Sequence, residues 1–189
     1  NRRSRGLGDV YKRQMIDFLL KKRAGIKNNL PIVGPVNENY WAFGDSYNKG
    51  AWVLHTLRNA INNDDIWFST LKKFAVDNAK SHVSTETFLN HIIKSTGKNY
   101  QLIFYQYFYD HRPPTFEYYR EGQMFYYRWS NVISDFAMPV DIDLNGVEKR
   151  LEVSEKLSSI NISEHSVIHI RDWESLIITK RNPDLKKLN

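Results

Sequence analysis

The chain of 189 residues contains no cysteine and only three methionines. Without cysteine the protein has no disulfide and no thiolate metal ligand, although this absence does not identify a cellular compartment. No apolar run approaches the ~20 residues that a membrane helix needs, and the first residues lack the apolar middle part of a signal peptide. The sequence therefore predicts no membrane span.

The basic character of the chain comes largely from its first fourteen residues. The whole sequence holds 27 Lys and Arg residues against 21 Asp and Glu, with a pI near 9.4. Residues 1–14 contain five of the basic residues and one acidic residue, which leaves 22 basic and 20 acidic residues, a net charge of +2, for the rest. Nucleic-acid binding needs a clustered basic face, because neutralisation of phosphates drives it. The nearly balanced remainder therefore predicts no nucleic-acid partner.

Residues 1–14 are also distinct in pattern. They show neither a helical nor a strand period of apolar residues, and they resemble translated adaptor sequence. We expect a non-native or disordered tail here, the alternative being a disordered basic arm. In both cases the segment is expected not to pack against the rest of the chain.

The remainder has the composition of a folded protein and begins with a helical pattern. Hydrophobic residues make up 41% of the sequence and aromatic residues 14%, enough to build a core. Apolar residues recur at helical spacing in five segments before a Pro113-Pro114 pair, and Gly97 ends the fourth. These predicted helices cover residues 15–24, 48–62, 65–78, 84–95 and 100–109.

After the proline pair the pattern changes to strands. Val140, Ile142 and Leu144 alternate with acidic residues, and the following Asn145-Gly146 is a strong hairpin signal. Predicted strands cover residues 116–120, 123–129, 138–144, 147–153, 167–171 and 175–180. The fold class is therefore α+β, an N-terminal segment of five helices followed by a small antiparallel β-sandwich. The predicted units are a tail (1–14), a helical part (15–112), a sandwich (113–182) and a second tail (183–189).

The most informative stretch runs from Gly44 to Arg58. Ala51, Leu54 and Leu57 recur at helical spacing, and Asp45 or Ser46 can cap the helix that they predict. A tyrosine directly before such a helix would present a protonated phenol at the start of the helix. Tyr47 is our candidate catalytic residue, the alternative being a structural aromatic residue.

This stretch resembles a motif of the gluzincin zinc aminopeptidases, the alanyl aminopeptidase or aminopeptidase N family. In that family a Tyr-x-Lys-Gly-Ala run opens a helix that ends in Leu-Arg, and the matching residues here are Tyr47, Lys49, Gly50, Ala51, Leu57 and Arg58. Further similarity extends over roughly residues 20–150. The resemblance places residues 15–112 in the distal helical part of the catalytic domain, with the sandwich after it.

The resemblance implies a peptide substrate, a zinc cofactor and a role for Tyr47. In these enzymes a His-Glu-x-x-His motif and a later Glu hold the zinc, and the tyrosine donates a hydrogen bond to the tetrahedral oxyanion. This chain contains no such motif, because none of its six histidines is followed by Glu. The resemblance therefore implies a fragment that binds no zinc, is inactive alone, and belongs with the rest of a parent chain that supplies the metal site.

Two other motifs resemble catalytic or metal-binding motifs but do not meet their requirements. His165 and His169 are four apart, but the residues between them favour a strand, on which they would lie about 13 Å apart, too far to share a zinc ion. Gly44-Asp45-Ser46-Tyr47-Asn48 begins like a serine nucleophile elbow but lacks the final glycine and a preceding strand.

Two further functions remain as alternatives to the aminopeptidase. A non-catalytic relative could use the same scaffold for protein interaction, since a scaffold does not fix its chemistry. A nucleic-acid-binding module could use the aromatic and arginine residues of 116–120 and 125–129 to stack on bases. The simpler interpretation of these aromatic residues is core packing of the sandwich.

Overall fold

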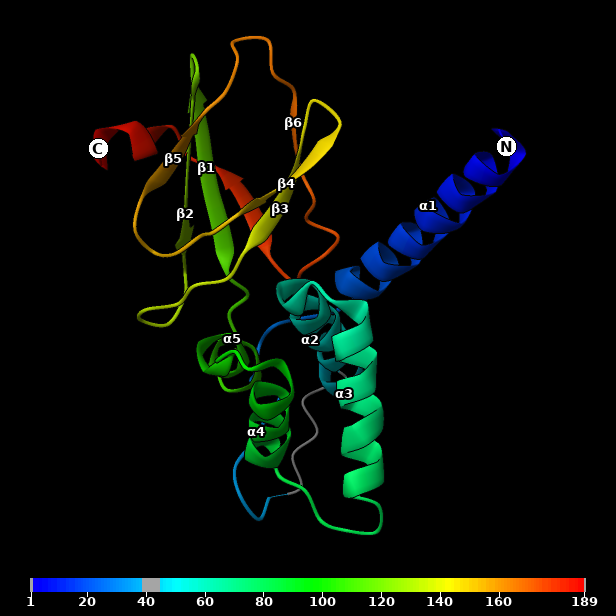
Figure 1. Cartoon of the computed structure of the whole chain (residues 1–189). Coiled ribbons are helices and arrows are strands. Elements are labelled where there is room, and N and C mark those ends of the chain that lie inside the picture. The colour runs from blue at the N-terminus through cyan, green and yellow to red at the C-terminus, as the bar shows by residue number, and fades with distance from the viewer. Residues whose placement is uncertain (1, 39–44, 189) are drawn as a thin grey trace.

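The computed structural model describes residues 2–38 and 45–188. Within these ranges helices come first and strands second, and α2–α5 lie together on one side of the strands (Figure 1). The helices are α1 (Arg2–Ala24), α2 (Asp45–Ile61), α3 (Asp64–Asp77), α4 (Thr85–Thr96) and α5 (Gln101–Phe108). The predicted α+β class and the order of its parts are confirmed.

Local signals set several helix ends. The Asn63 side chain accepts a bond from the Ile66 amide at the start of α3, and Ser84 and Thr87 form a reciprocal capping box at the start of α4. Gly97 ends α4 with a φ of 69°, in the left-handed region that glycine adopts without steric cost. These ends therefore lie close to the predicted ones.

Helix α1 begins at Arg2, whereas the sequence predicted a helix only from residue 15. It projects away from the other helices and the strands, with its N-terminal end far from both (Figure 1). Val10 and Arg13, whose side chains are described, are exposed. Helical conformation in residues 2–14 thus differs from the expected disordered tail, and its described side chains add nothing to the core.

The strands form two sheets. The first has the order β5-β2-β1-β7 and the second β4-β3-β6. The strands are β1 (Thr115–Glu121), β2 (Met124–Ser130), β3 (Val140–Leu144), β4 (Val147–Leu151), β5 (Ser158–Asn161), β6 (Ile168–Ile170) and β7 (Ile178–Arg181). The predicted hairpin is present between β3 and β4, where Asn145 and Gly146 have φ values of 54° and 79°, as a tight turn of this kind requires.

Three features of the strand region differ from the sequence-based expectation. The sequence did not predict β5, which pairs with β2. Strand β7 runs parallel to β1, so the first sheet is mixed rather than purely antiparallel. Residues 183–188, expected to be a tail, form the 3₁₀ helix η1 (Pro183–Leu188), in which Leu185 is fully buried.

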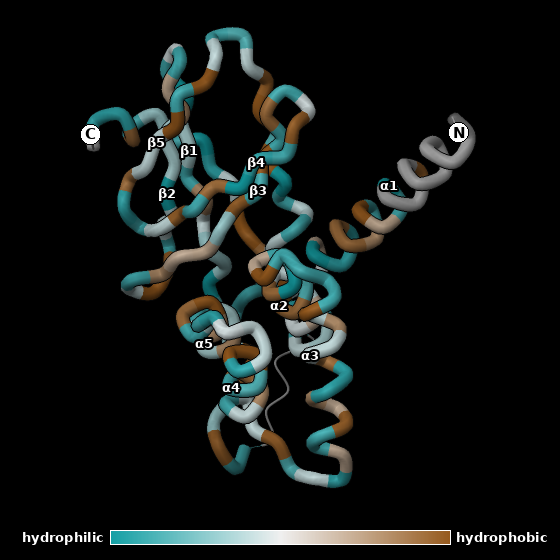
Figure 2. The backbone as a smooth tube through the Cα atoms, viewed as in Figure 1, coloured by the Kyte–Doolittle hydropathy of each residue, from teal (hydrophilic) through white to brown (hydrophobic). Residues whose placement is uncertain are grey.

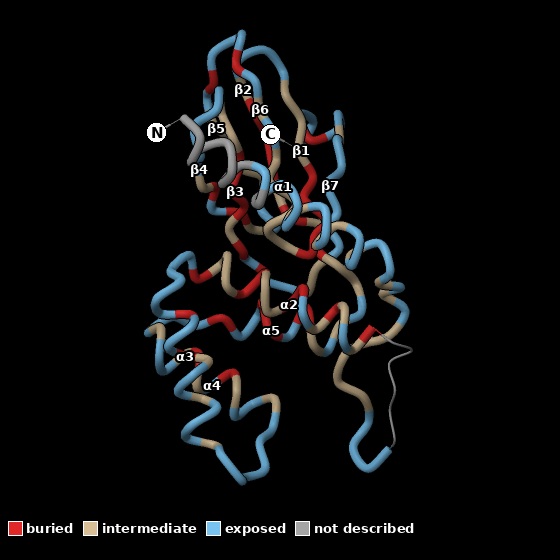
Figure 3. Tube along the Cα trace, turned by 90° about the vertical axis from the view of Figure 1, so that its right-hand side faces the viewer, coloured by how far each residue is buried: buried red, intermediate tan, exposed pale blue. Residues whose placement is uncertain are grey.

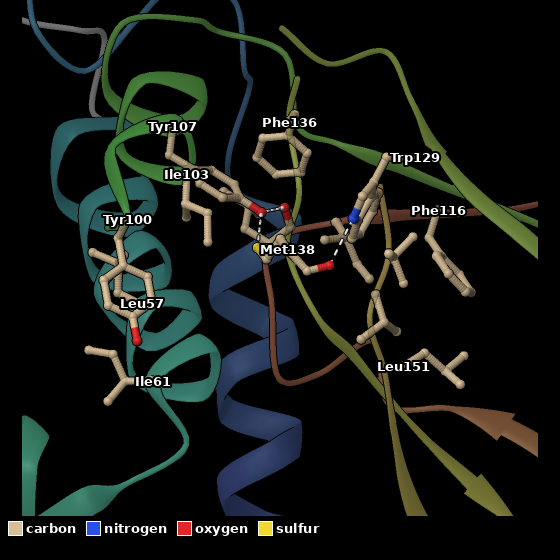
Figure 4. Packing of buried hydrophobic residues seen from close by; sticks show 14 of the residues in the cluster. Leu57, Ile61, Tyr100, Ile103, Tyr107, Phe116, Trp129, Phe136, Met138 and Leu151 are labelled. Carbon is tan, nitrogen blue, oxygen red and sulfur yellow. Dashed lines mark hydrogen bonds between the residues drawn. The ribbon is translucent and has the colours of Figure 1, made fainter. Parts of the chain in front are cut away.

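One hydrophobic cluster joins the helices to both sheets. Leu57 and Tyr107 from the helices belong to the same cluster as Phe116 of the first sheet and Ile142 of the second. Figure 4 shows helical residues facing strand residues across this cluster, and Figure 3 shows buried segments in both halves. Hydrophobic and hydrophilic residues are interspersed along α2–α5 (Figure 2).

The aromatic residues of β1 and β2 contribute to this core. Phe116, Phe125 and Trp129 are each at most 2% exposed, and the Trp129 indole donates to the backbone oxygen of Met138 at 2.9 Å. Core packing is therefore the correct interpretation of these three side chains. No helix in the described part of the chain combines the length and the apolar character that a membrane crossing requires.

Candidate functional site

Tyr47 lies in the first turn of α2, whereas the sequence predicted it directly before the helix, and the residue is 76% exposed. No described residue accepts a hydrogen bond from its phenol. The turn that carries it is the N-terminal end of a helix of 17 residues, where unpaired amide groups and the helix dipole favour negative charge. Among the described residues the phenol therefore has no hydrogen-bond acceptor, and it lies next to a region of positive potential.

Asp45, two residues earlier, is buried and anchors this turn. Its carboxylate oxygens accept bonds from the backbone amides of Lys27 and Asn28, at 2.9 and 2.8 Å. The sequence offered Asp45 or Ser46 as the cap of this helix. In the structure the carboxylate instead ties the start of α2 to the segment that follows α1.

Lys49, two residues after Tyr47, is only 1% exposed. Its ammonium donates to the backbone oxygen of His111 at 2.9 Å, which ties the first turn of α2 to the segment between α5 and β1. Burial lowers the pKa of the Lys49 ammonium below its ordinary value, while the carboxylates of Asp45 and Asp110 oppose that shift. The lysine of the Tyr-x-Lys-Gly-Ala run is therefore an internal group rather than a surface charge.

The rest of the motif divides between the surface and the core. Leu57 is fully buried, and Ala51 is exposed. Arg58 forms a two-point ion pair with Asp64, with N–O distances of 2.7 and 2.6 Å. A Cβ atom placed on Gly50 would meet no atom within 4 Å. Within the described structure, therefore, no close packing requires glycine at position 50.

The described residues do not form a metal site. No group of three or more His, Asp or Glu side chains in residues 2–38 and 45–188 is arranged to hold a metal ion. His169 lies in β6, in agreement with the strand expected there, whereas His165, expected on the same strand, lies in the loop before it. The donors among the described residues therefore do not fit a zinc ion.

The sequence did not reveal a second polar cluster, which joins the helices to the loop between β6 and β7. Arg23 pairs with Asp172 at 3.0 Å, and His55 donates from Nε2 to the backbone oxygen of Trp173 at 3.2 Å. Thr56 accepts a bond from the Leu176 amide at 2.9 Å. These contacts link residues more than 100 positions apart, so no local pattern could have predicted them.

Three open hollows on the surface do not include the first turn of α2. Their volumes are about 400, 490 and 530 Å³, and they lie between α3 and α4, between the two sheets, and beside α5. Tyr47 lines none of these three. Tyr47 therefore lies on an exposed helix face outside these three hollows.

Comparison with known proteins bears on the fold. No family model and no curated protein sequence matches the chain. A crystal structure of Legionella pneumophila aminopeptidase A in complex with aspartic acid superposes with a TM-score of 0.64 and 18% sequence identity, over 82% of this chain and 20% of that one. The chain has an aminopeptidase-like fold. It spans about a fifth of the length of the Legionella enzyme.

Proposed function

We propose that this chain is part of a gluzincin zinc aminopeptidase, which removes N-terminal residues from peptides, and that Tyr47 is one of its catalytic residues. The observation that carries the proposal is the placement of Tyr47: its phenol is exposed on the first turn of α2, while Asp45 and Lys49, two positions before and after it, are buried. The aminopeptidase-like fold supports it.

The proposed role of Tyr47 follows from the charge that develops during peptide hydrolysis. When water adds to the scissile carbonyl, negative charge gathers on the carbonyl oxygen. A phenol O–H directed at that oxygen stabilises the transition state more than the neutral substrate, and this difference is what accelerates the reaction. Tyr47 carries an exposed O–H donor for this purpose and lies near the positive end of α2.

The zinc ion and its ligands would belong to the rest of the parent protein. When bound, zinc supplies a Lewis acid for the carbonyl and lowers the pKa of water. The described residues do not provide its ligands. This chain is therefore expected to hydrolyse nothing alone, and its partners would be the remainder of the parent chain and a peptide substrate.

The test is an assay of the full-length protein with aminoacyl p-nitroanilides, in the parent and in Tyr47→Phe. Loss of one oxyanion donor should lower kcat by on the order of 10²–10³. Tyr105→Phe is the matched control, since Tyr105 is also an exposed helical tyrosine. An inactive full-length protein would favour the non-catalytic scaffold, and an active one with unchanged kcat in Tyr47→Phe would remove Tyr47 from the mechanism.

A further inference from the structure

Asp45 and Lys49 are buried charged residues that the proposed chemistry does not use. They are 5% and 1% exposed. Removing charged groups from water costs several kcal/mol per ion, and apolar residues of similar volume often give equal or greater stability. Stability alone therefore does not explain why two charged side chains occupy these positions.

The two residues bracket Tyr47 in sequence and oppose it in space. Positions four apart on a helix lie on the same face, whereas a position midway between them is rotated by about 200° from each. The exposed fractions fit this geometry, since Tyr47 is 76% exposed while Asp45 and Lys49 are buried. One face of the turn is thus fixed in the interior and the other carries the phenol.

Each buried charge binds a different part of the chain. Asp45 accepts bonds from two consecutive amides in the segment after α1, and Lys49 donates to a carbonyl in the segment after α5. The partners are 17, 18 and 62 positions away in the sequence. The first turn of α2 is therefore held from two sides by charged hydrogen bonds, which are stronger than neutral ones.

We propose that Asp45 and Lys49 are positioning residues, which fix the first turn of α2 and thereby the direction of the Tyr47 phenol. The proposal rests on the proposed catalytic role of Tyr47. A donor to an oxyanion must be held in place before the reaction, and a displacement of about 1 Å can reduce the rate about a hundredfold. Tyr47 is a surface residue without a hydrogen-bond partner among the described residues. Its position therefore depends on how rigidly the backbone of the first turn is held.

The first arm of the test is a double-mutant cycle in the full-length protein. Lys49→Met keeps the length of the side chain and removes its charge, and should lower kcat by about ten- to a hundredfold with KM changed less than about threefold. If Lys49 acts through Tyr47, the variant with both Lys49→Met and Tyr47→Phe should be no slower than Tyr47→Phe alone. Thr56→Val, a buried change further along α2, is the control, and its effect should multiply with that of Tyr47→Phe.

The second arm uses the 189-residue chain and does not depend on activity. Amide hydrogen exchange at residues 49–52, whose helical bonds close the first turn, should become at least about tenfold faster in Lys49→Met. Exchange at residues 57–60 should stay within about twofold of the parent. Asp45→Asn, which retains one acceptor oxygen, serves as a second variant if Lys49→Met does not fold, and should leave one of the Lys27 and Asn28 amides without its acceptor.

The outcomes separate this inference from the function on which it rests. The positioning role would be overturned if the kcat losses of Lys49→Met and Tyr47→Phe multiply in the double variant. It would also be overturned if hydrogen exchange became uniformly faster along the whole of α2 in Lys49→Met. Unchanged activity in Tyr47→Phe would instead remove the proposed catalytic role, and the exchange data would still decide whether the two charges order the turn.

Discussion

Tyr107 in α5 donates a hydrogen bond from its hydroxyl to the backbone oxygen of Leu176, 69 positions later in the chain and 3.0 Å away. The ring is fully buried in the cluster between the helices and the strands (Figure 4). Burial raises the pKa of the Tyr107 phenol, so the hydroxyl stays protonated and remains a donor. This bond ties the helical part directly to the segment that leads into β7.

Tyr107→Phe should lower the free energy of unfolding by about 1–3 kcal/mol, because the buried carbonyl of Leu176 loses its hydrogen-bond donor. Urea denaturation at pH 7 measures the change. Tyr105→Phe, in the same helix but with an exposed ring, should stay within about 0.5 kcal/mol of the parent. Equal effects at the two positions would contradict a structural role for the Leu176 bond.

Thr56→Val should also lower the free energy of unfolding, because Thr56 binds the backbone amide of Leu176, whose backbone oxygen binds Tyr107. Its hydroxyl donates to the Trp52 oxygen at 2.8 Å and accepts from the Leu176 amide at 2.9 Å. We expect a loss of about 1–3 kcal/mol. In combination with Tyr107→Phe the losses should be non-additive by about 0.5–3 kcal/mol, since both contacts hold one segment. Strictly additive losses would show that the two bonds act independently.

The free energy of unfolding should decrease as the pH is lowered, because of His55. Burial lowers the pKa of His55, the bond to the Trp173 oxygen opposes this shift, and the charge of Arg58 adds to it. The unfolded chain binds the proton near pH 6.5, and the folded chain only at lower pH. Between these values the unfolded state holds more protons, so acidification from pH 7 favours unfolding. Urea unfolding at pH 7, 6 and 5 should show a smaller pH slope for His55→Gln than for the parent.

The control for this titration is His82→Gln at an exposed position. It should leave the slope between pH 7 and pH 5 close to that of the parent. A slope that is identical in the parent and in His55→Gln would rule out His55 as the group responsible.

Two Gly→Ala changes should have opposite effects on the stability of the chain. Gly50 lies inside α2 with open space around its Cβ position, so Gly50→Ala should stabilise the chain by about 0.5–1 kcal/mol. Gly146 has a φ of 79° in the β3–β4 turn, so Gly146→Ala should destabilise it by about 1–2 kcal/mol. Thermal unfolding gives both signs. If Gly50→Ala stabilises this chain but lowers kcat in the full-length protein, the open space is used in the active enzyme.

Buried and exposed Arg–Asp pairs should differ in strength. Arg150 forms a two-point pair with Asp141, whose side chain is 7% exposed, and also donates to the Asn59 oxygen of α2. Asp141→Asn should cost about 1.5–3 kcal/mol. Asp64→Asn breaks the similar pair with Arg58, but there the carboxylate is 59% exposed, so the loss should stay below about 1 kcal/mol. A larger loss for Asp64→Asn would contradict the assignment.

The helices were predictable because their signals are local. The Ser84 capping box and Gly97 lie within a few residues of the ends that they set, and the β3–β4 hairpin follows from two adjacent residues with positive φ. Strand β5 was missed because its partly polar residues 158–161 show no strong apolar alternation, and only pairing with β2 makes them a strand. The parallel direction of β7 depends on the path of the chain before it.

For the candidate site, the sequence by itself determined the helix, the place of Tyr47 at its start and the order of helices before strands, because periodicity and capping act over a few residues. Only the tertiary structure decided that Lys49 and Asp45 are buried and that Tyr47 is exposed. Burial depends on which distant segments pack on each face of a helix. Here those segments follow α1 and α5, and neither adjoins the motif in sequence.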